Sequence, residues 1–268
     1  MNEKRTLAGY RILNTRAVHQ ATTLTKKIEQ IGGTSIEIPL IEIKRSQPNI
    51  SLKSVIQDFS SDDWIVFTSK NGISFFFEHL SEEKLRIDYL SHVNIAVVGE
   101  KTKKTAEKYQ LNVKACPSNY TAESLKDELI EKVKKDSKIL IVRGNLARPT
   151  LREGLKEIGF SIIDFIAYET KHIIHNEDLL QKLIRNKQLD FITFTSSSTV
   201  ESFISFINNY NLNEFLKDFV FVSIGSVTAK TLSSYGLKPV LTPDKFTIDG
   251  MIDVMCAFVM NEKGRNYT

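Results

Sequence analysis

Two kinds of hydrophobic pattern alternate along the chain. Short apolar runs such as residues 63–68 predict buried strands, whereas apolar residues three or four positions apart, as at Val18, Ala21, Leu24 and Ile28, predict a helix. The pattern predicts strands over 10–15, 63–68, 94–98, 112–116 and 138–143, and helices over 18–31, 50–59, 71–80, 101–108 and 121–135. Residues 34–43 alternate like a strand, but Pro39 interrupts them, which favours a sheet edge or an extended connector.

The pattern occurs twice. The stretch DWIVFTSKN at 63–71 returns as DFITFTSSS at 190–198, so Thr68 corresponds to Thr195 at an offset of 195 − 68 = 127. Further residues correspond at nearly the same offset: Arg16 and Arg143, Gly32 and Gly159, Gly99 and Gly225, Thr102 and Thr228, Tyr109 and Tyr235, and Pro117 and Pro243. Two copies of about 125 residues that each alternate strand and helix predict duplicated α/β domains with parallel sheets and helices on both faces. The pattern alone puts their boundary near residue 136.

The composition narrows the function classes. The chain is 41% hydrophobic and 25% charged with a net charge of +4, and its basic residues are scattered, so no basic stripe predicts nucleic-acid binding. The mild positive balance suits an anionic small molecule. Cys116 and Cys256 show no metal-binding or disulfide spacing, which indicates a reducing compartment. Because the N-terminus lacks an apolar signal core and no apolar run reaches about 18 residues, we expect a cytoplasmic protein without a membrane span.

Candidate binding residues follow the predicted strands, because ligands of parallel α/β sheets bind beyond the carboxyl ends of the strands. The first copy offers Thr15, Arg16, Thr68, Ser69, Lys70, Asn71, Gly99, Lys101 and Thr102, and the second offers Arg143, Gly144, Asn145, Arg148, Thr195, Ser196, Ser197, Ser198, Gly225, Ser226 and Thr228. Hydroxyls, helix N-termini and cations favour carboxylates or phosphates as ligands. The alternative is structural, with hydroxyls as N-caps, glycines as tight turns, and the two repeated arginines paired with surface carboxylates.

Familiar catalytic motifs are missing from the sequence. It contains no GxGxxG motif, P-loop or GxSxG motif, and its five histidines show no metal-binding spacing. Tyr168 lies in FIAYETK, a segment that occupies the same place in the second copy as residues 38–44 in the first. Its ring is explained by packing at a hinge. If the segment instead lines a cleft between domains, the phenol would act as a weak acid or orient a leaving group.

Several of these features in this order resemble the uroporphyrinogen-III synthase family over about residues 8–260. They are Thr15-Arg16, the repeated Phe-Thr-Ser, the glycine turns at Gly99 and Gly225, the segment from Arg143 to Arg148, and the tyrosine in AYET. The resemblance implies two similar α/β domains of flavodoxin-like topology, with parallel sheets flanked by helices, joined by a two-stranded extended linker. Residues 1–38 and 172–268 would form one domain, 44–165 the other, and 38–44 and 165–171 the linker strands.

The resemblance also implies a reaction, in which hydroxymethylbilane loses water and closes to uroporphyrinogen III with inversion of ring D, through an azafulvene and a spiro intermediate and without a metal or other cofactor. Tyr168 would assist loss of the hydroxyl without being an indispensable general acid. The loop residues would hold the acetate and propionate arms: Thr68, Ser69, Thr195, Ser196, Ser197, Gly225, Ser226 and Thr228. Lys70 and Asp249-Gly250 depart from the residues usual in the family. A monomer that receives its substrate from hydroxymethylbilane synthase is expected.

A function of another class stays open. The chain would then be a non-catalytic two-domain module that binds an anionic small molecule, or a synthase-like protein without activity. A nucleotide-sugar transferase is disfavoured because the sequence has no long glycine-rich phosphate loop. We also expect the domains to move about the two connectors, because two strands form a thin hinge.

Overall fold

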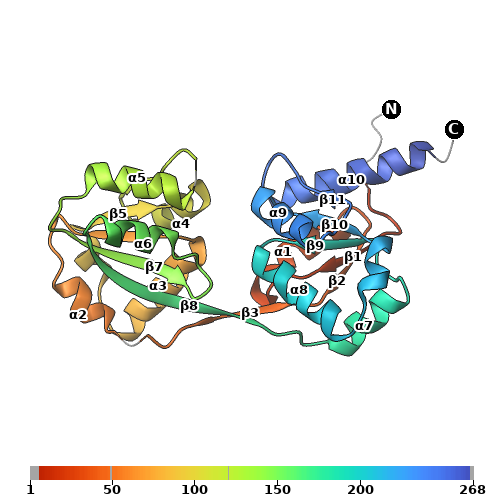
Figure 1. Cartoon of the computed structure of the whole chain (residues 1–268), viewed down its shortest axis with the longest axis horizontal. Coiled ribbons are helices and arrows are strands. Elements are labelled where there is room, and N and C mark those ends of the chain that lie inside the picture. The colour runs from red at the N-terminus through yellow and green to blue at the C-terminus, as the bar shows by residue number, and fades with distance from the viewer. Residues whose placement is uncertain (1–5, 49, 120, 266–268) are drawn as a thin grey trace. The chain divides into compact units, whose positions relative to one another are not determined.

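The computed structural model describes residues 6–48, 50–119 and 121–265, so residues 1–5 of the N-terminal stretch considered above lie outside it (Figure 1). The chain divides into two compact units. Unit 1 contains the chain up to Glu42 and again from Lys171, and unit 2 contains Ile43–Thr170. No helix in the described residues is long and apolar enough to cross a membrane.

Unit 1 has a five-stranded sheet in the order β11-β10-β9-β1-β2, and every neighbouring pair is parallel. Its strands are β1 (Arg11–Asn14), β2 (Thr34–Glu37), β9 (Phe191–Phe194), β10 (Val220–Ser223) and β11 (Val240–Leu241). Its helices are α1 (Val18–Glu29), α7 (Glu177–Arg185), α8 (Ser197–Asn209), α9 (Ser226–Ser234) and α10 (Ile248–Arg265), with a 3-10 turn η2 (Asn213–Asp218).

Helices cover both faces of this sheet because successive strand residues point to opposite sides (Figure 1). Ile12 packs with Leu24 of α1 and Met255 of α10 on one face. Leu13, the next residue, packs with Phe203 of α8 on the other face.

Unit 2 has a six-stranded sheet in the order β3-β8-β7-β4-β5-β6. Its strands are β3 (Ile41–Arg45), β4 (Trp64–Phe67), β5 (Asn94–Val97), β6 (Val113–Ala115), β7 (Lys138–Gly144) and β8 (Ser161–His172). Its helices are α2 (Leu52–Gln57), α3 (Lys70–Glu82), α4 (Glu100–Lys108), α5 (Ala122–Lys132) and α6 (Thr150–Glu157), with a 3-10 turn η1 (Ile87–Leu90). Phe67 and Phe76 pack on the face covered by α2, α3 and α4, and Trp64 and Leu125 on the face covered by α5 and α6.

The predicted α/β class, with parallel sheets flanked by helices, is confirmed. Some predicted helices are too long at their ends. The helix predicted over 121–135 ends at Lys132, since Val133 already has extended backbone angles. The helix predicted over 18–31 ends at Glu29, and Gly32 turns the chain with a φ of 84°. Its repeat partner Gly159 has a φ of 100°, a conformation that glycine adopts at little cost.

The two sequence copies are not the two units. Strands β1 and β2 of the first copy share a sheet with β9, β10 and β11 of the second, while β7 and β8 of the second share a sheet with β4, β5 and β6 of the first. Strands that correspond in the repeat nevertheless occupy corresponding positions, since β2-β1-β9-β10-β11 matches β8-β7-β4-β5-β6. The division between the units falls inside both β3 and β8.

Candidate functional site

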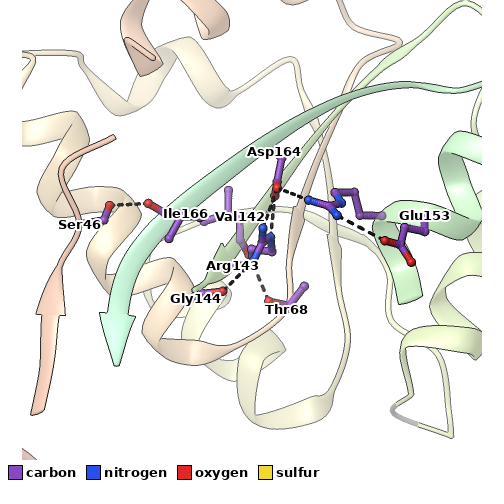
Figure 2. Close-up of polar contacts among 9 residues, drawn as sticks. Ser46, Thr68, Val142, Arg143, Gly144, Glu153, Asp164 and Ile166 are labelled. Carbon is purple, nitrogen blue, oxygen red and sulfur yellow. Dashed lines mark hydrogen bonds and ion pairs between the residues drawn. The ribbon is translucent and has the colours of Figure 1, made fainter. Parts of the chain in front are cut away.

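In each sheet there are two neighbouring strands from which the chain continues in opposite directions along the sheet. Parallel α/β sheets bind ligands beyond the carboxyl ends of such a pair of strands. In unit 1 this pair is β1 and β9, and in unit 2 it is β7 and β4. The repeated Phe-Thr-Ser segments follow β9 and β4, so they lie at these two pairs. Threonines join the neighbouring strands there. Thr15 donates to the Thr193 carbonyl at 2.6 Å in unit 1. Thr68 donates to the Val142 carbonyl at 3.3 Å in unit 2 (Figure 2).

Ser69 links the strand end of β4 to the Tyr168 phenol. Its Oγ accepts the Gly72 N–H at 3.0 Å, which makes it the N-cap of α3. The same Oγ lies 3.1 Å from the Tyr168 Oη, which comes from β8, 99 residues further along the chain. Ser69 is therefore an N-cap, as the structural alternative predicted. An N-cap only accepts a hydrogen bond, so the Ser69 hydroxyl proton stays available to the Tyr168 phenol.

Two neighbours fix the Tyr168 ring. It stacks on Phe75, with ring centroids 5.5 Å apart. It also lies directly against Gly144, where an added Cβ would be 2.5 Å from the tyrosine Cζ and 2.8 Å from its Oη. Burial raises the pKa of Tyr168 above its ordinary value, and the hydrogen bond to Ser69 offsets only part of this effect. The phenol therefore stays protonated at neutral pH.

Irregular pairing between β7 and β8 brings Tyr168 to this position. The register shifts between Arg143 and Gly144, so that Gly144 pairs with Tyr168. Beyond the shift, the Asn145 side chain continues the ladder: its Oδ1 accepts the Thr170 N–H at 2.8 Å and its Nδ2 donates to the Thr170 carbonyl at 3.3 Å. Asn145 thus holds β8 at the point where the chain leaves unit 2.

Arg143 is engaged within its own unit. Its Nε and Nη2 donate to the two oxygens of Asp164 at 2.6 and 2.7 Å, and its Nη1 donates to the Gly144 carbonyl at 3.1 Å (Figure 2). Arg152 donates to the same carboxylate at 3.0 Å. Burial acts to raise the pKa of Asp164, but the hydrogen bonds from Arg143 and Arg152 outweigh it and hold that pKa below its ordinary value. The alternative in which Arg143 pairs with a carboxylate is therefore correct.

Ser46 and His79 hold the segment of β8 just before Tyr168. Ser46 donates to the Ile166 carbonyl (Figure 2). The His79 Nε2 lies 2.9 Å from the Ala167 carbonyl. A carbonyl only accepts, so the Nε2 carries the proton of a neutral imidazole. His79 is 3% exposed, and this burial lowers its pKa below the ordinary value, against the opposing effect of the Ala167 hydrogen bond.

This histidine predicts an acid-sensitive stability. Because the pKa of His79 is lower in the folded protein, the unfolded chain binds the proton first as the pH falls. The contribution of neutral His79 to the free energy of unfolding is therefore complete above pH 6.5 and is lost as the pH falls through the folded-state pKa. Between about pH 7.5 and about pH 5.5 we expect the wild type to lose more unfolding free energy than His79→Gln, measured by urea titration. The matched control is His175→Gln, an exposed histidine, which should keep the wild-type pH dependence. Equal losses in wild type and His79→Gln would contradict this assignment.

The corresponding edge of unit 1 has hydroxyls without a tyrosine. Ser196 is the N-cap of α8 and accepts the Thr199 N–H at 3.3 Å, and Ser197 lies 2.8 Å from the Thr231 hydroxyl of α9. Thr195 is half-buried beside them. Gly225 caps α9 and is buried, because the Phe246 ring lies on it: an added Cβ would be 2.9 Å from that ring.

The remaining predicted residues divide by exposure. Those at the open ends of the loops and helices are Lys70, Lys101, Arg148 and Ser226, all exposed. Gly99 begins α4 with extended backbone angles, so a left-handed turn does not explain it. Thr102 and Thr228 are only 7% and 5% exposed and pack inside the first turns of α4 and α9. No cluster of histidine, cysteine, aspartate or glutamate suited to a metal ion occurs in the described ranges.

Two features of these edges were missed from the sequence. The pairing of Asp164 with Arg143 could not be predicted from the sequence pattern. The one indication was that Asp164 lies in the strand that follows the strand of Arg143. Phe246 is 48% exposed beside the N-terminus of α9, and its repeat counterpart is Tyr120 (246 − 126 = 120), which lies outside the described residues.

The uroporphyrinogen-III synthase HemD family model matches residues 22–253. The porphyrin biosynthesis protein HemD of Ruminiclostridium josui is 32% identical over 250 residues, covering 93% of this chain and 49% of that protein, so the chain spans about half of that relative. A putative uroporphyrinogen-III synthase of Methanocaldococcus jannaschii is 30% identical over 246 residues, covering 91% of this chain and 97% of that protein.

Solved structures agree on the fold. A mutant uroporphyrinogen III synthase from Thermus thermophilus aligns with a TM-score of 0.68 at 17% identity, covering 95% of this chain and 99% of that one. The synthase of Helicobacter pylori aligns with a TM-score of 0.60 at 18% identity, covering 93% and 99%. Because the family match extends over both units and the relatives cover nine-tenths of the chain, this protein belongs to the uroporphyrinogen-III synthase family.

Proposed function

We propose that the chain closes hydroxymethylbilane to uroporphyrinogen III, inverting ring D and releasing one water molecule. The observation that carries this proposal is the family match over residues 22–253, which includes both Phe-Thr-Ser segments and Tyr168. We also propose that it acts as a cytoplasmic monomer that takes its substrate from hydroxymethylbilane synthase.

The substrate carries an acetate and a propionate arm on every ring, so its binding needs many carboxylate partners. Each unit offers such partners at its own carboxyl edge, where hydroxyls lie at helix N-termini and partial positive charge favours anions. The proposed partners are Thr68, Ser69, Lys70, Gly99, Lys101, Arg148, Thr195, Ser196, Ser197, Gly225 and Ser226. Thr102 and Thr228 support these loops from inside the first turns of α4 and α9, where they are 7% and 5% exposed.

Tyr168 is the proposed catalytic residue. The Ser69 Oγ accepts from the Gly72 N–H and still has its own proton, and we assign that proton to the Tyr168 Oη, which leaves the phenol proton available to the substrate. We assign to this proton a hydrogen bond to the departing hydroxyl of hydroxymethylbilane. Loss of that hydroxyl gives the azafulvene, which ring D attacks to form the spiro intermediate and, after rearrangement, the inverted ring.

A raised phenol pKa makes Tyr168 a weak acid, and a weak acid is sufficient here. The electron-rich pyrroles expel the hydroxyl, so the protein contributes mainly by holding the flexible chain in a ring-closing pose. The half-buried ring of Tyr168 suits this positioning, because it stacks on Phe75 and its hydroxyl lies 3.1 Å from the Ser69 Oγ.

The test is the isomer formed from hydroxymethylbilane. Purified protein is supplied with enzymatically generated hydroxymethylbilane, and the products are oxidised and separated by chromatography. We expect isomer III to predominate, and heat-inactivated protein should give the spontaneous isomer I. Isomer I alone from the active, folded protein would contradict the proposal and favour a non-catalytic binding module.

A further inference from the structure

Arg16 differs in its contacts from its repeat partner Arg143. It lies between β1 and α1 and is only 9% exposed. Its backbone N–H donates to the Asn14 Oδ1 at 3.3 Å, and one terminal nitrogen donates to the Gln20 Oε1 at 3.4 Å, a long contact. Its buried Nε has no hydrogen-bond partner within the described residues. A buried guanidinium ordinarily has a carboxylate partner, since burying an uncompensated charge is costly.

The acid that could have neutralised Arg16 is used elsewhere. Asp164 corresponds in the repeat to Glu37, since 164 − 127 = 37, and the registers agree: Ile141 pairs with Asp164, and Asn14 with Glu37. Glu37 instead accepts from the Thr25 hydroxyl of α1. Unit 2 therefore pairs its arginine internally, whereas no carboxylate of the described residues pairs with the Arg16 guanidinium in unit 1.

The helix that follows Arg16 adds to the local positive potential. Helix α1 has 12 residues, begins after Ala17 without a side-chain cap, and has no acidic residue in its first turn. The contact with Gln20 places the Arg16 guanidinium beside this turn. Ser69 and Ser196, in contrast, cap their helices with their own hydroxyls. A guanidinium beside an uncapped helix N-terminus is suited to a carboxylate from outside the chain.

We infer that Arg16 and the N-terminus of α1 bind one carboxylate arm of the substrate, whereas Arg143 serves only to hold β8. This inference rests on the proposed function. It gives different roles to Arg16 and Arg143, although the two residues correspond in the sequence repeat. Val18, the first residue of α1, is 65% exposed, and the pyrrole ring that carries the bound arm would cover such an apolar side chain.

The test compares Arg16→Gln with Arg16→Lys. We expect Arg16→Gln to raise the KM for hydroxymethylbilane at least about tenfold, with a smaller change in kcat, because a charge-assisted hydrogen bond is lost in both ground and transition states. Lysine keeps the charge but not the planar fork and should recover part of the affinity. Binding of uroporphyrin III, the oxidised product, followed by its fluorescence, should weaken in parallel.

Stability separates binding from a structural role. Arg16→Gln should leave the unfolding midpoint unchanged or raise it, since it removes a buried charge that has no partner. The matched variant Arg143→Gln should lower the midpoint, because it breaks the pair with Asp164. If wild type forms isomer III and Arg16→Gln keeps both the KM and the uroporphyrin affinity, the inference is overturned. If wild type forms only isomer I, the proposed function fails instead, and a loss of uroporphyrin affinity in Arg16→Gln would still support the carboxylate site.

Discussion

Gly144→Ala is expected to lower the rate of isomer III formation by about one to two orders of magnitude. The new methyl carbon would lie 2.5 Å from the Tyr168 Cζ, 2.7 Å from its Cε2 and 2.8 Å from its Oη, so the ring has to move. Movement would break the contact with Ser69 and shift the phenol away from the departing hydroxyl. The measurement is the initial rate of isomer III formation, with hydroxymethylbilane above its KM.

Gly154→Ala is the matched control for this substitution. Gly154 lies in α6, and its added Cβ would meet the flexible Lys126 side chain at 2.7 Å, which can move at little cost. Alanine also favours a helix by roughly 1 kcal/mol over glycine, so this variant should be active and no less stable. A Gly144→Ala enzyme as active as Gly154→Ala would show that the position of Tyr168 does not matter for the reaction.

Asp164→Ala is expected to lower the unfolding free energy of unit 2 by about 2–4 kcal/mol. The change removes both hydrogen bonds from Arg143 and the one from Arg152, and leaves a guanidinium whose side chain is only 12% exposed without its carboxylate. The reporter is Trp64, the single tryptophan, which is 5% exposed on β4 of the same sheet. Its fluorescence during urea titration measures the loss.

Asp62→Ala provides the comparison at the surface. Asp62 binds Lys134 at 2.7 and 2.8 Å, but the two side chains are 49% and 72% exposed, so the pair should contribute less than about 1 kcal/mol. An Asp164→Ala midpoint shifted no further than that of Asp62→Ala would contradict the role given to Asp164.

The local elements could be predicted because their signals are local. Residues 64–67 are apolar and all buried, and Ser69 and Ser196 stand where N-caps are expected. The pairing of strands is a different matter. Hydrophobic period says which residues face a core, but not that β1 joins β9, with Ile12 opposite Phe191, 179 residues away (191 − 12 = 179).

The contacts at the carboxyl ends of the strands were harder to predict for the same reason, because they join residues that are far apart in the sequence. The repeat gave Arg16 and Arg143 one role, yet their contacts differ because Asp164 reaches its arginine and Glu37 is bound by α1. Tyr168 was singled out by its place in the segment FIAYETK, and the family resemblance added its role, but its contact with Ser69 depends on a register shift that no sequence pattern marks. Phe246 lies on Gly225 because the loop after β11 is next to the start of α9, which follows the neighbouring strand β10.

The most direct test of the account is a crystal structure of the protein with uroporphyrinogen III bound. The account predicts product carboxylates within hydrogen-bond distance of hydroxyls and helix N-termini that follow β4 or β9, with one carboxylate on Arg16 and the Tyr168 hydroxyl facing the inverted ring. A product bound away from these strand ends, with the Phe-Thr-Ser loops and Tyr168 untouched, would contradict it.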